Sequence, residues 1–395
     1  MLLPLHPKPF KDELLSSWAT RLAIENGMYS HALYKGVLNL DSSIFTRDID
    51  RLYIPELINK LEVKTKQNAE QIKNLMLTSF EGQLFEKINS NGFTKWILPL
   101  GIYHRTRKKH GIQYCPQCLK DSSTAYFRKH WRLSFCLFCE KHQCLLRDKC
   151  PHCNNVIDYQ RRGIGSQQYE TPATDLSLCS FCERPLWQGN NRKISSELEP
   201  YIGLCLHFTK QFTKGEPCFP SLNQPLALQE FNGLWELIAG LMKRRYFEGG
   251  IKTKIKEILN IDIASSIDQK SHPSFELRSS EERLKILITV LWLLDDWPNR
   301  LITLSEGTIF SKSAYSDFDR PLCYWLRQVI FSDLDKSIYT ANIEELNSIV
   351  KYLKKHRIPT TDRTVSLYAN MYVGTLRKKV GFVANLSNPT FPKKT

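Results

Sequence analysis

The sequence predicts a mainly α-helical protein with a small metal-stabilised α+β module between its N-terminal and C-terminal parts. Three observations support this fold class. A chain of 395 residues usually forms two or three domains, and its 42% hydrophobic content is typical of folded proteins. Apolar residues recur at helical spacing in both halves of the chain. Seven of the twelve cysteines lie within residues 114–153, which indicates a small module that needs cross-linking ligands.

We expect an N-terminal helical domain over residues 1–100. Its first helix reads DELLSSWATRLAIENG, with Asp12 as N-cap, and a second helix, HALYKGVLNL, follows a short turn with Ser30 as N-cap. Two short helices joined by a Gly-containing turn are typical of a helix-turn-helix, although a plain helical hairpin fits the same spacing. A further capped helix is expected over residues 65–80.

The C-terminal part, residues 193–395, is expected to be a helical domain. Helical patterns cover residues 228–247, 281–297 and 342–356. After them, residues 361–382 form a second helix-turn-helix candidate, and its second helix is more basic than that of the first candidate.

The module between these domains, residues 101–192, contains four pairs of metal-ligand candidates. In each pair the two ligands lie three residues apart, a spacing at which a tight turn aims both side chains at one tetrahedral ion. Four thiolate-rich pairs predict two closed, structural zinc sites, that is, tandem zinc fingers. Sequential and cross-braced pairings use the same residues, and Cys136 and Cys144 lack partners at this spacing. The ligand candidates are Cys115, Cys118, Cys139, His142, Cys150, Cys153, Cys179 and Cys182.

Charge favours a nucleic-acid partner. The chain has 55 Lys and Arg against 40 Asp and Glu, a formal net charge of +15. The longest apolar stretch, residues 286–294, is about half the length of a bilayer span, and the first residues do not resemble a signal peptide. We therefore expect a cytoplasmic protein that binds DNA rather than a membrane. The expected phosphate contacts are Arg105, Lys108, Lys109, Arg377, Lys378 and Lys379.

One stretch of the chain resembles a known signature. It consists of a CPxC pair, a Tyr, a Trp-Arg, a CxxH pair, a Leu and a second CPxC pair. This order is similar to the zinc-finger signature of the TniQ/TnsD family of Tn7-like transposon target-selection proteins. The opening HPKPFKDELLSSWATRLAIENG also resembles the start of that family. Glu140 stands where the family commonly has a proline. Besides the six ligands, the matching positions are Pro116, Tyr126, Trp131, Arg132, Leu145 and Pro151.

The resemblance implies a non-catalytic adaptor. Such proteins recognise attachment-site DNA directly, or a CRISPR effector (Cascade) with its guide RNA on DNA. They recruit the AAA+ regulator TnsC, which brings the transposase, and shorter members can form homodimers. A zinc-containing, sequence-specific transcription regulator is the alternative. A nuclease built on Asp295 and Asp296 lacks a third carboxylate partner, and the absence of a GxxxxGK[ST] loop disfavours an ATPase.

Overall fold

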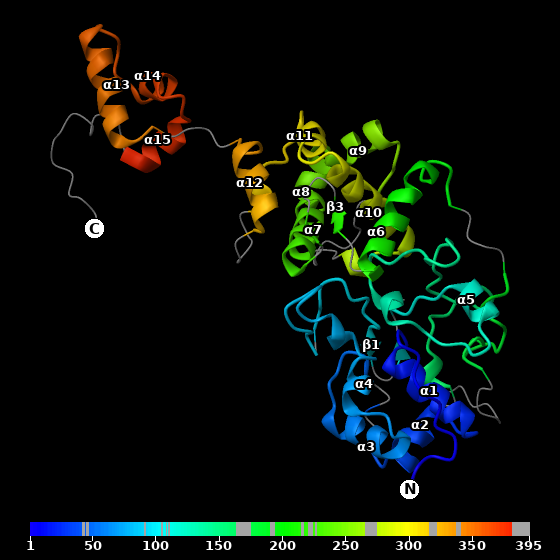
Figure 1. Cartoon of the computed structure of the whole chain (residues 1–395). Coiled ribbons are helices and arrows are strands. Elements are labelled where there is room, and N and C mark those ends of the chain that lie inside the picture. Colours follow the sequence, from blue (N-terminus) through cyan, green and yellow to red (C-terminus); the bar gives the residue numbers. More distant parts are fainter. Residues whose placement is uncertain are drawn as a thin grey trace. The chain divides into compact units, whose positions relative to one another are not determined.

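A computed structural model describes residues 1–41, 44, 47–90, 92–103, 106–107, 109, 111–162, 175–189, 194–214, 217–219, 224–225, 227–264, 275–315, 322–336 and 341–380. The chain divides into two compact units, Met1–Leu334 and Asp335–Thr395. Helices dominate both units, and the strands are short, which confirms the predicted fold class (Figure 1). Among the described residues, no helix combines the length and apolar character that a membrane crossing requires.

The N-terminal part of the first unit is a group of short helices around its own core. They are α1 (Leu15–Glu25), α2 (Ser30–Ala32), which continues into a π-helical turn (Leu33–Val37), α3 (Pro55–Thr65), α4 (Ala69–Lys73) and a 3-10 turn (Leu77–Phe80). Their apolar faces bury a cluster that excludes water and holds the helices together. Members of this cluster include Leu15, Trp18, Leu22, Leu33, Leu57 and Leu61.

Three local predictions in this part were wrong. Ser30 does not cap α2, because it is the first residue of the helix, and the N-cap is Tyr29 without a side-chain cap hydrogen bond. Asp12 does not cap α1, which begins at Leu15 without a side-chain cap, because the Asp12 carboxylate instead binds Arg128 and Tyr126. The helix expected over residues 65–80 is interrupted. Only α4 is α-helical there, capped by Asn68 and Gln71, and a separate 3-10 turn follows it. Tertiary contacts outweigh the local capping preference at Asp12, and local capping outweighs the apolar periodicity over residues 65–80.

The described residues in the middle of the first unit form turns, isolated bridges and one small two-stranded sheet. A hairpin pairs β1 (Ile102–Tyr103) with β2 (Thr106–Arg107), and α5 (Pro116–Asp121) follows. Three tight hairpins then close with single antiparallel bridges, Phe138 with Leu145, Lys149 with Val156 and Leu178 with Pro185. Segments this short bury little apolar surface of their own, so they need another source of stability.

Most helices in the rest of the first unit are longer. They are α6 (Ile202–Lys214), α7 (Leu228–Leu241), α8 (Arg244–Tyr246), a π-helical turn (Phe247–Ile251), α9 (Lys252–Leu259), α10 (Ser280–Asp295), α11 (Asn299–Ser305) and α12 (Tyr324–Ser332); β3 (Pro217–Phe219) pairs with β4 (Gln224–Pro225). Helices form where residues 228–247 and 281–297 predict them, although α7 stops at Leu241. The α10 helix starts at a capping box of Ser279 and Glu282.

Aromatic rings join these helices to the middle of the unit. Phe135 stacks on Phe231 of α7 with ring centroids 5.5 Å apart, and Trp96 meets both rings edge-on. Arg283 of α10 donates to the Ser134 carbonyl and to Gln113 Oε1. One buried core therefore includes residues on both sides of the domain boundaries expected near residues 100 and 192. The domain boundaries expected there stay predictions.

Within its described residues, the second unit has three helices around a separate core. They are α13 (Ile343–Lys355), α14 (Asp362–Tyr368) and α15 (Val373–Val380). A capping box of Asn342 and Glu345 begins α13 where residues 342–356 predict a helix. Of the helix-turn-helix candidate at 361–382, residues 381 and 382 lie outside the described residues. The core contains Leu346, Val350, Leu353, Val365, Leu376 and Val380.

Candidate metal centre

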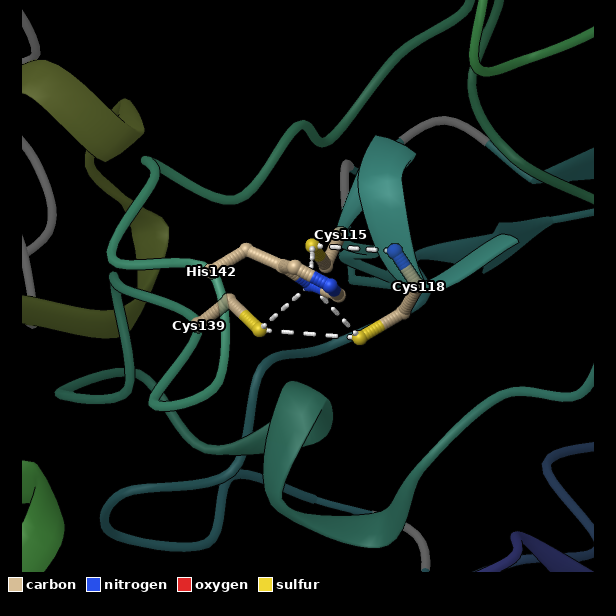
Figure 2. Close-up of side chains that lie close together, drawn as sticks. All are labelled: Cys115, Cys118, Cys139 and His142. Atoms are coloured by element: carbon tan, nitrogen blue, oxygen red, sulfur yellow. Dashed lines mark hydrogen bonds between the residues drawn. The ribbon is translucent and has the colours of Figure 1, made fainter. Parts of the chain in front are cut away.

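Four predicted ligands meet in a first cluster. The Nδ1 atom of His142 lies 3.4 Å from the Sγ of Cys115, 3.3 Å from that of Cys118 and 3.6 Å from that of Cys139 (Figure 2). The Sγ atoms of Cys118 and Cys139 are 3.6 Å apart. All four ligand atoms lie within 4.8 Å of one another. The three cysteines are buried and His142 is partly exposed.

The other four predicted ligands form a second cluster of cysteines only. The Sγ atoms of Cys150 and Cys182 are 3.7 Å apart, as are those of Cys153 and Cys179. These four sulfurs also lie within 4.8 Å of one another. Neighbouring pairs along the chain share a cluster, so the structure has the sequential pairing rather than the cross-braced one.

Three of the four ligand pairs have the same backbone geometry. The residue after the second ligand takes a left-handed conformation in each: Gln143 (φ 50°), Asn154 (φ 58°) and Glu183 (φ 58°). Its amide donates to the carbonyl of the first ligand at 2.7 to 3.0 Å, which closes the turn. The remaining pair differs because Cys115 is the N-cap of α5, and its Sγ accepts the amide of Cys118. Turn closure thus aims both side chains of a pair at one point.

The distances within both clusters fit a tetrahedral zinc ion. Zn–S bonds of about 2.3 Å and Zn–N bonds of about 2.0 Å imply S···S separations of about 3.8 Å and S···N separations of about 3.5 Å. The observed contacts are 3.6 to 3.7 Å between sulfurs of one set and 3.3 to 3.6 Å between sulfur and Nδ1. All eleven cysteines whose state is described are free thiols, so no disulfide accounts for their approach. Both clusters could therefore hold a metal ion.

The two unpaired cysteines of this region differ from each other. Cys136 is fully buried, and burial raises the pKa of its thiol well above the usual value, so it packs as a neutral apolar group. Cys144 is half-buried, and its Sγ lies 3.5 Å from that of Cys115. Sequence spacing gave no sign of this proximity. Cys144 belongs to neither four-ligand set.

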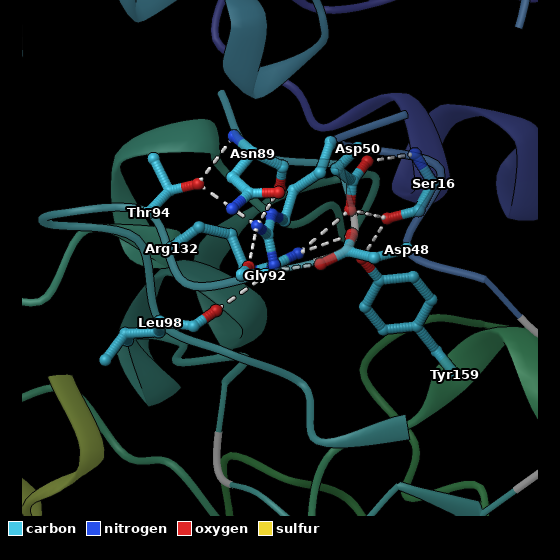
Figure 3. A network of polar contacts seen from close by, with 10 residues as sticks. Ser16, Asp48, Asp50, Asn89, Gly92, Thr94, Leu98, Arg132 and Tyr159 are labelled. Carbon is cyan, nitrogen blue, oxygen red and sulfur yellow. Dashed lines mark hydrogen bonds and ion pairs between the residues drawn. The ribbon is translucent and has the colours of Figure 1, made fainter. Parts of the chain in front are cut away.

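A buried charge network joins the region of the metal clusters to the N-terminal helices (Figure 3). The guanidinium of Arg132 bonds both carboxylate oxygens of Asp48, at 2.7 and 3.2 Å, and Oδ2 of Asp50 at 3.2 Å. Asp50 accepts the Ser16 amide and hydroxyl, and the Ser16 Oγ meets the Tyr159 hydroxyl at 2.7 Å. Four segments distant in sequence are thereby held by one set of polar bonds.

Burial and neighbouring charges together set the pKa values in this network. Burial and the neighbouring charge of Asp48 raise the pKa of Asp50 to about 6, although Arg132 opposes the shift. Burial alone would lower the pKa of Arg132, but the charges of Asp48 and Asp50 raise it. In the sequence, Arg132 stands out only as part of the signature, and neither of its acidic partners is predicted. No periodic or spacing signal marks Asp48 or Asp50.

Other residues in and beside the family signature also join the region of the metal clusters to the N-terminal residues. Tyr126 stacks on Phe10 at 4.3 Å between ring centroids, and its hydroxyl donates to Asp12. The Ser17 hydroxyl accepts the Phe127 amide at 2.9 Å. The two stretches of sequence that resemble the family are therefore packed against each other, which is a physical reason for them to occur together.

The six expected phosphate contacts are only partly described. Arg105 and Lys108 lie outside the described residues, and Lys109 is exposed. Arg377, Lys378 and Lys379 are exposed on α15 of the second unit. Arg377 pairs with Asp362 at 2.7 Å, and the Lys379 ammonium donates to the Ala341 carbonyl. Their role in DNA binding stays a prediction.

Fold and site together define a helical protein with two closed four-ligand clusters suited to structural metal ions. The TniQ family model matches residues 4–146. This match supports membership of the TniQ family, and a TniQ domain implies a protein associated with Tn7-like transposition. Comparison with curated proteins gives no match.

Proposed function

We propose that this chain is a non-catalytic target-selection adaptor of a Tn7-like transposon. It links target DNA, or a DNA-bound Cascade complex, to the AAA+ regulator TnsC, and TnsC brings the transposase. The observation that carries this proposal is the TniQ domain at residues 4–146. In this role the chain supplies binding surfaces and no chemistry of its own.

The chemistry of the metal clusters supports the non-catalytic part of the proposal. Each cluster has four protein ligands, and such a set saturates a tetrahedral zinc ion and leaves no position for a reactive water. The adjacent carboxylates of Asp295 and Asp296 have structural partners, since Asp295 pairs with Arg300 and Asp296 accepts from Asn299. Zinc at these sites would stabilise the turns that carry the ligands, and with them the protein surface around the clusters.

The second unit supports a direct role in DNA binding. Residues 341–380 contain eight Lys and Arg against three Asp and Glu. A four-residue connection between α14 and α15 contains Asn370 in a left-handed conformation and buries Met371. Two short helices with such a connection, preceded by a third, match the layout of helix-turn-helix DNA readers.

On this proposal, α15 is the recognition helix. Leu376 and Val380 are buried in the core, whereas Tyr372 and Thr375 are exposed near the start of the helix. These two side chains would face base edges, because a recognition helix presents its N-terminal residues to the major groove. Lys378 and the nearby Arg377 would neutralise phosphates.

A pull-down with purified partners tests the proposal. The tagged chain is incubated separately with TnsC, with guide-loaded Cascade and with target DNA from the same transposon. We expect TnsC to be retained, together with Cascade or the DNA. A double charge reversal, Arg377→Glu with Lys378→Glu, should weaken retention of DNA and leave retention of TnsC unchanged. Failure of the wild-type chain to retain TnsC would contradict the adaptor role.

A further inference from the structure

The first metal cluster has an acidic neighbour that the ligand spacing does not reveal. His142 approaches the three sulfurs through Nδ1, and its other ring nitrogen, Nε2, lies 3.2 Å from Oδ2 of Asp121. A neutral imidazole that ligates through Nδ1 carries its proton on Nε2. That proton is then available for donation to the Asp121 carboxylate.

The position of Asp121 within α5 strengthens this reading. Asp121 is the last residue of the helix, whose N-cap is Cys115 and whose first turn contains Cys118. A carboxylate at a helix C-terminus is unfavourable, because the partial charge there is also negative. Residues three apart lie on one face of a helix, so Cys118 and Asp121 point to the same side. One short helix thus supplies two sulfur ligands and the partner of the histidine.

We propose that Asp121 is a positioning residue for the first metal site. Its carboxylate accepts the Nε2 proton of His142, fixes the tautomer that leaves Nδ1 free to ligate, and holds the ring toward the three sulfurs. Carboxylate partners of ligating histidines also increase ligand basicity, and their removal typically costs about 10- to 100-fold in metal affinity. Asp121 has 45% side-chain exposure, so we expect an effect near tenfold.

The second cluster provides an internal control. It consists of four cysteines and contains no histidine. The nearby His152 is not a ligand, and its Nε2 lies 3.1 Å from the Pro185 carbonyl. Loss of Asp121 should therefore weaken one site and leave the other unchanged. This inference does not depend on the role of the protein in transposition.

Cobalt(II) titration of the full-length apoprotein tests the proposal, because the d–d absorption of a three-sulfur, one-nitrogen site differs from that of a four-sulfur site. For Asp121→Ala we expect affinity at the first site to fall about tenfold, with no change at the second. Asp121→Asn should give a smaller loss, since the amide oxygen still accepts the Nε2 proton but carries no charge. Circular dichroism of the cobalt-saturated variants would confirm that they are folded.

Asp295→Asn is the matched control, because Asp295 is also the last residue of a helix and also has a partner, Arg300. It should leave both affinities unchanged. Wild-type affinity at the first site in Asp121→Ala would overturn the proposal. An equal loss at both sites would also overturn it, because that result would indicate general destabilisation rather than positioning of His142.

Discussion

Arg132, which lies between the ligand candidates Cys118 and Cys139 in the sequence, forms an ion pair with Asp50 of the N-terminal region, and both side chains are almost completely buried, at 0% and 2% exposure. Asp48 binds the same guanidinium through both of its carboxylate oxygens, and the Leu98 carbonyl accepts from Nη2 at 3.0 Å. A buried charge is costly unless its partners are in place. This pair therefore makes the N-terminal helices and the metal-binding turns depend on each other.

Removal of Arg132 should be strongly destabilising. Arg132→Ala leaves two carboxylates uncompensated, and breaking a buried pair in this way typically costs about 3–5 kcal/mol of unfolding free energy. Arg132→Lys should also lose stability, because one ammonium cannot reproduce the planar, two-nitrogen contact with Asp48. Urea unfolding with zinc present in excess measures both variants.

The control for this prediction is Lys60→Ala, which removes an exposed i,i+4 pair with Glu56. Exposed pairs of this kind contribute about 0.3–0.5 kcal/mol. A loss for Arg132→Ala no larger than that of the control would contradict the account of the buried network.

Protonation of Asp50 should make stability depend on pH. The pKa of Asp50 is raised to about 6 in the folded protein by burial, whereas an unfolded Asp titrates near pH 3.9. The folded state holds the proton more tightly, so this contribution to unfolding free energy is fully present below about pH 4. It is lost as pH rises through about 6, and the loss is about 3 kcal/mol.

Asp50→Asn isolates this contribution, because the amide cannot ionise. We expect the stability of the wild type relative to Asp50→Asn to decrease between about pH 4 and pH 6 and to become level above that range. Denaturant unfolding at several pH values gives this difference directly. Parallel pH curves for the two proteins would show that Asp50 has no raised pKa.

The number of bound metal ions should equal the number of intact four-ligand sets. Elemental analysis of protein purified without chelator should give two zinc ions per chain. Cys150→Ser removes a ligand of the second cluster and should reduce the count to one, with loss of folded structure around that cluster. Cys144→Ser should keep both ions, because Cys144 lies beside Cys115 but outside both sets. A zinc count near zero in the wild type would contradict the assignment.

The left-handed backbone conformation of the residue that follows a ligand pair should limit which side chains are tolerated at that position. Asn154 has φ 58° and an exposed side chain, so its backbone conformation is the main constraint. Asn154→Val should cost about 1–2 kcal/mol, because a β-branched side chain is strained at positive φ. Asn154→Gly should be close to neutral or stabilising. Chelator-induced unfolding compares the two variants, and equal behaviour would exclude a role for the turn conformation.

Local spacing predicted the ligand clusters well because both side chains of a pair come from one turn. The partners of His142 beyond the sulfurs were not predictable in this way, since Asp121 meets the imidazole only after two turns have folded together. The same holds for Arg132 and Asp50, which are 82 residues apart. At Asp12 a local signal gave a wrong prediction. The residue is of a type that commonly caps helices, but its carboxylate forms long-range bonds to Tyr126 and Arg128 instead.

Reconstituted transposition tests the central claim most directly. Purified transposase, TnsC and target DNA, with guide-loaded Cascade where the element encodes one, are combined with or without this chain, and insertion sites are mapped by sequencing. The adaptor role predicts that insertions concentrate at one target position only when the chain is present, and that the Cys150→Ser variant fails to restore them. The same insertion pattern with and without the chain would contradict the claim.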